Sequence, residues 1–166
     1  MEDREQRLNE VAGIAVALEK QTGCPARLMI AQWALESEWG AKPVGHFNFF
    51  GIKKAERHNQ CCTVTTHEVV NGKSIVENLE FAGYDSLADS CADYAWLITK
   101  GAPYQAAWKQ YQQGRDLGAL IASVARVYAT DPGYAHWAGA IAVQANVTQA
   151  LAAVGGLSLH NPVAID

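Results

Sequence analysis

The residue of this sequence best suited to acid–base chemistry is Glu36. It belongs to a set spaced three and four residues apart, which is one face of a helix: Leu28, Ala31, Gln32, Leu35, Glu36 and Trp39. That face is apolar except for Gln32 and Glu36. Because desolvation disfavours an ionised carboxylate, a glutamate placed there finds a partner or keeps its proton near neutral pH. A carboxyl group that keeps its proton at that pH is what a general acid requires.

An aromatic loop follows this helix directly. Gly40 is placed to end the helix just after Trp39, and residues 47–51 then read Phe-Asn-Phe-Phe-Gly. A carboxyl group beside aromatic rings and an amide is consistent with a site that binds and cleaves a sugar chain. A single glutamate on a helix is ordinarily a solvated surface residue. Glu38 falls off the apolar stripe and fits that description, whereas Glu36 does not.

A second carboxyl group is needed for most glycosidic cleavage, on the opposite side of the bond. Three glutamates in the segment 61–81 are candidates, namely Glu68, Glu77 and Glu80. Periodicity alone describes all three as exposed strand residues. Tyr128, at the end of a later buried stripe, could hold a carboxylate or an N-acetyl group. Packing in the core explains that tyrosine better when the pattern alone is considered.

The elements that must position these residues are mostly helical. Helices are expected over residues 4–21, 25–39, 87–100, 103–112, 117–128 and 134–154, with a loop over 41–60. Ser86 with Asp89 resembles a capping box. Segment 61–81 is rich in β-branched residues around Asn71-Gly72, which is typical of a hairpin of two or three strands. The sequence therefore predicts one mainly α domain over 1–156, with a β-lobe, a cleft between the lobes, and a tail over 157–166.

Composition excludes several functional classes. The 166 residues carry a formal charge of -4, and no basic block points to nucleic acid. No stretch approaches the roughly 20 apolar residues of a membrane span. Residues 1–7 are charged and no signal-type apolar run follows, so synthesis in the cytoplasm is expected, with release by lysis or a dedicated route.

The four cysteines lack CxxC or metal-type spacing to histidine. Free thiols are therefore expected, with Cys24 and Cys91 half-buried on helices, and no metal or cofactor.

Three separated motifs together resemble one enzyme family. The first joins Ala34-Leu35-Glu36-Ser37 and Trp39-Gly40 to Asn48-Phe49-Phe50-Gly51-Ile52-Lys53; the second is Phe81, Tyr84, Asp85 and Ser86 after the hairpin; the third is Tyr128-Ala129-Thr130-Asp131-Pro132 with Tyr134. In this order and spacing they resemble glycoside hydrolase family 73, the endo-β-N-acetylglucosaminidases that cut bacterial peptidoglycan. The resemblance covers roughly residues 8–153. It implies a lysozyme-like helical core with a small β-lobe.

The resemblance also implies roles for particular residues. Glu36 would be the general acid, Tyr128 the active-site tyrosine, and Glu68, in the context Thr66-His67-Glu68, the second carboxylate. The side chains expected to contact the glycan are Gln32, Trp39, Asn48, Phe49, Phe50 and Tyr134. Two positions depart from the family pattern. Glu38 replaces a small residue and would raise the pKa of Glu36 further, and Ala82 stands where an arginine is common.

The implied reaction is hydrolysis of the β-1,4 bond on the reducing side of N-acetylglucosamine in peptidoglycan strands. The chain is expected to act as a monomer. Glu68 would activate a water with inversion, or the N-acetyl group of the substrate would assist, and both routes need Glu36 protonated. Two alternatives stay open. One is a non-catalytic glycan-binding module on the same fold, and the other is a muramidase.

Overall fold

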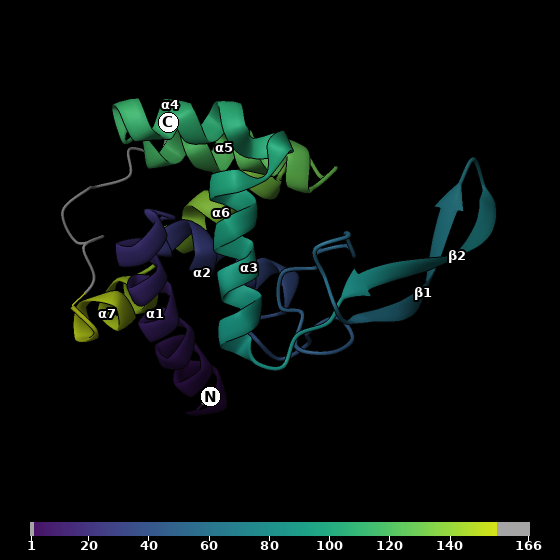
Figure 1. Cartoon of the computed structure of the whole chain (residues 1–166), viewed down its shortest axis with the longest axis horizontal. Coiled ribbons are helices and arrows are strands. Elements are labelled where there is room, and N and C mark those ends of the chain that lie inside the picture. Colours follow the sequence, from purple (N-terminus) through teal and green to yellow (C-terminus); the bar gives the residue numbers. More distant parts are fainter. Residues whose placement is uncertain (1, 156–166) are drawn as a thin grey trace.

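The structure, a computed structural model, describes residues 2–155. Residue 1, residues 156–166 with the predicted tail, and the side chains of residues 2 and 68–70 lie outside the described part. The elements in chain order are α1 (Glu2–Thr22), α2 (Ala26–Glu36), β1 (Cys61–Val70), β2 (Lys73–Ala82), α3 (Leu87–Lys100), the 3-10 turn η1 (Ala102–Tyr104), α4 (Gln105–Gly114), α5 (Leu117–Tyr128), α6 (Tyr134–Ala142) and α7 (Ala145–Ala153). The predicted mainly α fold with an inserted hairpin is confirmed (Figure 1).

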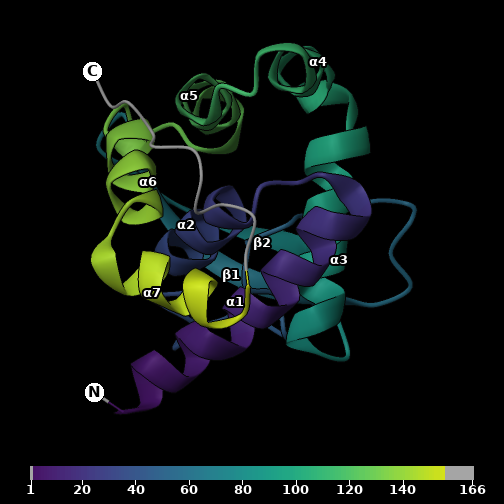
Figure 2. The ribbon, with the colours of Figure 1, turned by 90° about the vertical axis from the view of Figure 1, so that its left-hand side faces the viewer.

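The centre of the helical body is α2. Every residue from Ala26 to Ala34 is buried, and α1, α3 and α6 pack against this helix. Figure 2 shows α2 lying among the other helices. The single apolar stripe predicted for this segment therefore understates its burial, because a helix that is apolar on all sides belongs inside a protein. Only its last turn reaches a less buried region, and Glu36 is the last residue.

Two helix ends differ from the prediction. Helix α2 ends at Glu36, three residues before the predicted end at Trp39. The predicted helix over 134–154 is two helices, α6 and α7, separated at residues 143–144. The guanidinium of Arg27 donates to the carbonyl of Ala142 at 2.5 Å and to the hydroxyl of Thr148 at 3.1 Å. This contact satisfies a carbonyl at the end of α6, so the break is stabilised by a residue more than a hundred positions away.

Strands β1 and β2 form an antiparallel arm that extends away from the helical body (Figure 1). Asn71 and Gly72 have φ of 51° and 76°, the left-handed conformations that a two-residue hairpin turn requires. The base of the arm is tied to the loop after α2. Lys54 donates its backbone N–H to Glu80, and Ala82 donates to Ile52, both at 3.0 Å. The hairpin prediction is confirmed in its two-strand form.

The cysteines in the described part are free thiols. Cys24 and Cys91 are fully buried, more than the predicted half-burial, and Cys24 lies in the link between α1 and α2 rather than on a helix. Cys61 and Cys62 lie at the start of β1 near the surface. No helix within residues 2–155 has both the length and the apolar character needed to cross a lipid bilayer.

Candidate active site

A strained turn fixes the point at which α2 ends. Residues 38–40 all adopt left-handed backbone conformations, with φ of 50°, 59° and 79°. Such conformations cost about 1–3 kcal/mol each for residues other than glycine, and they cluster at functional sites. Ser37 stabilises the turn, because its buried hydroxyl donates to the carbonyl of Trp33 at 2.6 Å and accepts from the N–H of Gly40 at 2.9 Å. The carboxyl group of Glu36 is thereby held at the open end of the helix. Ser37 belongs to the first sequence motif, but its role in holding this turn was not predicted from the sequence.

A chain of hydrogen bonds orients the carboxyl group of Glu36. Tyr94 donates its hydroxyl hydrogen to Oε1 of buried Gln32, and Nε2 of Gln32 donates to the hydroxyl oxygen of Tyr134 at 3.1 Å. Tyr134 donates its one hydrogen to Oε1 of Glu36 at 2.5 Å. A protonated Glu36 therefore carries its hydrogen on Oε2. That oxygen faces Gly51, where an added Cβ would lie 3.5 Å from it.

Burial raises the pKa of Glu36, and the hydrogen bond from Tyr134 lowers it by a smaller amount. The net result keeps a proton on the half-buried carboxyl group to a higher pH than in free glutamate. Glu38 was expected to raise this pKa further through its charge. In the structure its carboxylate lies at the surface and pairs with Lys42 at 2.8 Å. Burial, rather than a second negative charge, is the cause of the shift.

Tyr128 stands beside Tyr134 across the short link between α5 and α6. Their ring centroids lie 6.4 Å apart with planes 24° from parallel, and the hydroxyl of Tyr128 donates to the carbonyl of Phe50. Burial, followed by the charge of Glu36, raises the pKa of both tyrosines far above the usual value. Both hydroxyl groups therefore remain protonated donors at any working pH.

A groove of about 390 Å³ opens next to these groups. It is lined by Gly51, Ile52, Lys53, Arg57, Leu97, Pro103, Tyr104, Val127 and Tyr128. Burial, followed by the charge of Glu36, raises the pKa of Tyr104 to about 12. Gly51, which lines the groove, also faces Oε2, so the groove borders the loop that lies next to the carboxyl group of Glu36. A site of this kind can protonate a bond held in the groove. Tyr104 was not predicted from the sequence.

The β arm carries the candidates for a second carboxylate. Glu68 pairs with Ile75 across the hairpin, and strand alternation places residue 68 on the same face as Thr66 and Glu77. This face is the less exposed one near the base of the arm, whereas Glu80 lies on the other face. The side chain of Glu68 is outside the described part, so its predicted role stays a prediction.

The sequence was compared with known protein families. A family model described as mannosyl-glycoprotein endo-beta-N-acetylglucosaminidase, the glucosaminidase family, matches residues 12–146. The chain belongs to the glucosaminidase family.

Relatives of this glucosaminidase-family chain include the peptidoglycan hydrolase FlgJ of Escherichia coli K12. That protein is 32% identical over 124 residues, covering 70% of this chain and 39% of FlgJ. A protein of Lactococcus lactis subsp. lactis named "Probable N-acetylmuramidase" is 29% identical over 150 residues, covering 86% of this chain and 34% of the relative. The chain thus spans little more than a third of the length of these relatives.

Solved structures show the same fold. The catalytic domain of the autolysin Auto from Listeria monocytogenes has a TM-score of 0.74 at 27% identity, over 89% of this chain and 86% of that domain. A peptidoglycan hydrolase from Sphingomonas sp. A1 has a TM-score of 0.70 at 25% identity, over 90% of this chain and 94% of that chain. The lysozyme-like architecture predicted from the sequence is confirmed.

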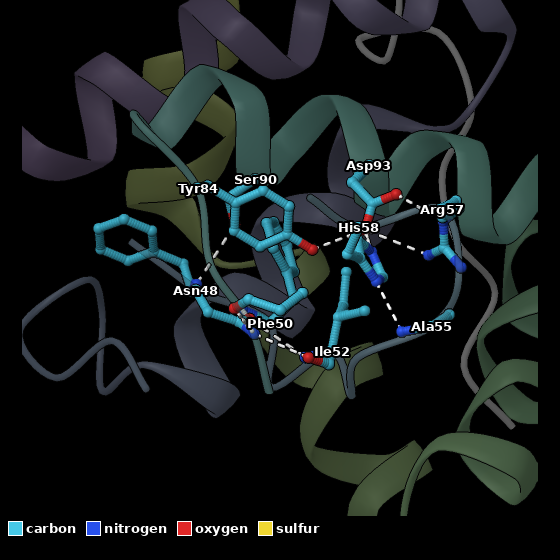
Figure 3. A network of polar contacts seen from close by, with 11 residues as sticks. Asn48, Phe50, Ile52, Ala55, Arg57, His58, Tyr84, Ser90 and Asp93 are labelled. Carbon is cyan, nitrogen blue, oxygen red and sulfur yellow. Dashed lines mark hydrogen bonds and ion pairs between the residues drawn. The ribbon is translucent and has the colours of Figure 1, made fainter. Parts of the chain in front are cut away.

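Asn48 of the glucosaminidase motif was predicted to bind substrate, but the structure gives it another task. The side chain is fully buried; its Nδ2 donates to the carbonyls of Ile52 and Ala82 at 2.8 and 2.9 Å, and its Oδ1 accepts from the N–H of Ile52 at 3.1 Å (Figure 3). Every polar atom of the amide is thus used to hold the loop against the base of the β arm. In the structure the side chain thus positions Gly51 and its neighbours, and its predicted contact with substrate stays a prediction.

The aromatic residues predicted to contact the glycan also pack inward. Phe50 is fully buried and stacks on Tyr94 with ring centroids 4.4 Å apart, and Phe49 is 9% exposed. The ring of Trp39 is covered by the guanidinium of Arg4 at 3.7 Å. In this conformation these aromatic rings support the turn and the loop that flank Glu36. Gln32 and Tyr134 act likewise, as the hydrogen-bond chain that orients its carboxyl group.

Asp93 on α3 anchors the loop that borders the groove and was not predicted from the sequence. Its carboxylate accepts from Arg57 at 3.0 Å, from Nε2 of His58 at 2.9 Å and from the hydroxyl of Tyr84 at 2.6 Å (Figure 3). Nδ1 of His58 accepts from the N–H of Ala55 at 2.8 Å. Burial raises the pKa of Asp93, but the hydrogen bonds from its three partners outweigh burial and leave that pKa low.

Proposed function

We propose that this chain hydrolyses the β-1,4 bond between N-acetylglucosamine and N-acetylmuramic acid in peptidoglycan, with Glu36 as the general acid. The observation that carries the proposal is the half-buried carboxyl group with a raised pKa, whose Oε2 faces the loop beside a groove. The names of the relatives, which include peptidoglycan hydrolases and autolysins, support the choice of polymer. The proposed catalytic unit is residues 1–156, acting on the cell wall as a monomer.

In the proposed mechanism Glu36 donates the hydrogen on Oε2 to the oxygen of the departing sugar. The hydrogen bond from Tyr134 to Oε1 stabilises the carboxylate as it forms. Glu68 then either activates a water on the far side of the ring or orients the N-acetyl group of the substrate. The separation of the two carboxyl groups in a substrate-bound state would distinguish these routes, because inversion requires room for a water between them.

A second candidate is a muramidase, which the name of the Lactococcus relatives favours. The two activities cut alternate bonds of the same strand, so their products differ. Purified peptidoglycan is digested, the new reducing ends are reduced with borohydride, and the fragments are weighed by mass spectrometry. Reduced N-acetylglucosamine at the new ends is the expected result. Reduced N-acetylmuramic acid would make the chain a muramidase.

The role of Glu36 is tested by Glu36→Gln, with Glu38→Gln as the matched control two residues away. We expect Glu36→Gln to lose at least about 100-fold in the release of reducing ends, because the amide cannot donate an acidic proton. Glu38→Gln removes only an exposed ion pair and should stay within about twofold of the wild type. Circular dichroism confirms that both variants fold. Full activity in Glu36→Gln would reject the assignment, and binding without any cleavage by the wild type would indicate the glycan-binding module.

A further inference from the structure

The groove beside Glu36 carries a charge opposite to that of the whole chain. The sequence has a formal net charge of -4, yet two of the residues lining the groove are cations, Lys53 and Arg57. Among the described residues that line it, none is an aspartate or glutamate. A positive wall in an acidic protein raises the local concentration of anionic ligands and repels none of the neutral ones.

The two cations differ in what they are free to bind. Arg57 is engaged with Asp93 at 3.0 and 3.2 Å, and its guanidinium lies 4.3 Å from the ring centroid of Trp96. Lys53 is exposed, and no carboxylate of the described residues lies within ion-pair distance of its ammonium group. Of the two cations that line the groove, Lys53 is thus the one that can take up a new anionic partner.

The backbone that carries Lys53 is held in place on both sides. Lys53 itself forms a β-bridge with Phe81 at the base of the arm. The preceding residue, Ile52, is bonded through both its N–H and its carbonyl to buried Asn48. Its neighbour Lys54 donates its N–H to Glu80 and is not among the residues that line the groove. Lys53 is therefore presented to the groove from a fixed position, and Lys54 is a matched lysine outside it.

We propose that Lys53 is a specificity-determining residue that binds a carboxylate of the substrate. The site would favour sugar chains that carry carboxylates over neutral amino-sugar chains. This inference rests on the proposed function, because it assigns the groove to the substrate of Glu36. In peptidoglycan the carboxylate has two sources, the lactyl group of the muramyl sugar when it carries no peptide, and the attached stem peptide. An ion pair at an exposed site contributes modestly and is weakened by salt.

The test compares Lys53→Gln with Lys54→Gln, each in the Glu36→Gln background for binding and in the wild-type background for cleavage. Three soluble ligands are used: glycan fragments with stem peptides, fragments stripped of peptide so that the lactyl carboxylate remains, and neutral N-acetylglucosamine oligomers. Calorimetry gives Kd at low salt and in 0.5 M salt (about 3–5 Å screening length). Initial rates give KM and kcat.

We expect Lys53→Gln to weaken binding of a carboxylate-bearing fragment by about three- to fivefold at low salt, with KM raised equally and kcat unchanged. High salt should abolish the difference, and binding of neutral oligomers should not change. Lys54→Gln should match its parent throughout. An effect confined to peptide-bearing fragments assigns the carboxylate to the stem peptide, and an effect confined to stripped fragments assigns it to the lactyl group.

Two results would overturn the inference. One is an equal loss for neutral and anionic ligands, which would mean that the substitution damaged the groove. The other is no loss for any ligand. If the wild-type chain cleaves no peptidoglycan, the proposed function fails by itself, and the calorimetric comparison of anionic with neutral fragments still decides whether Lys53 recognises a carboxylate.

Discussion

At the scale of the single residue, Tyr134 has two effects on Glu36 that can be separated. Its hydrogen bond to Oε1 lowers the pKa of a carboxyl group that burial raises, and it stabilises the carboxylate left after proton transfer. In Tyr134→Phe only burial remains, so the pKa of Glu36 rises further. Because a general acid works while protonated, the alkaline limb of the pH–rate profile should move to higher pH. The maximum rate should fall about 10-fold, the size of a lost hydrogen bond to a charged group.

The pH–rate profile of Tyr134→Phe, measured with soluble glycan fragments, checks both effects. Tyr104→Phe is the control, because that hydroxyl has no hydrogen bond to Glu36 among the described contacts. A limb that moves to lower pH would show that the tyrosine, rather than burial, is what raises the pKa.

The surroundings of a single residue could be predicted where they depend on its neighbours in the sequence, and not where they depend on contacts between distant segments. The partial burial and the raised pKa of Glu36 could be predicted because most of its apolar stripe lies within one helix. The burial of Asn48 and Phe50 could not be predicted, because it depends on how the loop folds against the β arm and α3. Asp93 was missed because its partners lie up to 36 positions away and show no periodicity. The sequence motif nevertheless selected the loop that faces the carboxyl group of Glu36.

At the scale of the element, the turn after α2 is the most constrained backbone of the site. Gly40 has φ of 79°, and an added Cβ would lie 2.5 Å from the ring of Trp33. Gly72 in the hairpin turn has a similar φ of 76° and no atom within 4 Å of such a Cβ. Gly72→Ala should therefore cost about 1 kcal/mol through backbone strain alone. Gly40→Ala should cost at least about 3 kcal/mol, since a clash in the core is added.

Urea denaturation at neutral pH measures both glycine variants. Equal costs would mean that the turn after Glu36 can move without disturbing the core, and that Trp33 does not constrain it. In that event the carboxyl group of Glu36 would not be fixed by the end of α2.

Asp93 is the anchor of the second element of the site, the loop over residues 51–58. Asp93→Asn weakens the contacts to Arg57 and His58, so we expect a loss of about 2 kcal/mol at pH 7. The pKa of Asp93 is lowered in the folded state, so its stabilising effect is present above the unfolded value near 3.8 and disappears as pH falls through the folded value. The stability gap between wild type and variant should therefore close in acid.

Denaturation from pH 7 down to pH 2.5 checks this prediction. Glu56→Gln, an exposed carboxylate in the same loop, is the control and should change stability by less than about 0.5 kcal/mol. A gap that widens in acid would contradict the assigned direction of the Asp93 pKa.

Element boundaries were predictable where a local cap sets them. Ser86 accepts from the backbone N–H of Asp89 at 3.1 Å, as the predicted capping box requires. Asp116, directly before the predicted start of a helix at residue 117, accepts from the N–H of Ala119 at 2.9 Å in the same way. The end of α2 and the break between α6 and α7 were not predictable in this way. The first depends on the strained turn held by Ser37, and the second on Arg27 of a distant helix.

At the scale of the whole molecule, the β arm and the helical body differ in how much apolar surface they bury. The body buries a continuous apolar core around α2, whereas every β2 side chain from Lys73 to Asn78 is exposed. Beyond its base the arm thus adds little buried apolar surface to the fold. Its length serves the site rather than stability, if Glu68 is the second carboxylate.

Shortening the arm separates these two contributions. Thr66 and Glu77 face each other across the hairpin in the same kind of hydrogen-bonded pair as Val70 and Lys73, which flank the native turn. Residues 67–76 can therefore be replaced by an Asn-Gly turn without changing the register below it. The helical body should remain folded, with a change in unfolding free energy of less than about 1 kcal/mol, because the removed side chains are mostly exposed. Activity should fall by at least about 100-fold, since Glu68 is gone.

Within the full-length chain, Glu68→Gln should reproduce that loss, whereas Glu77→Gln, on the same face, should keep activity. A shortened chain that unfolds would show that the arm supports the core, and one that still cleaves peptidoglycan would place the second catalytic group elsewhere.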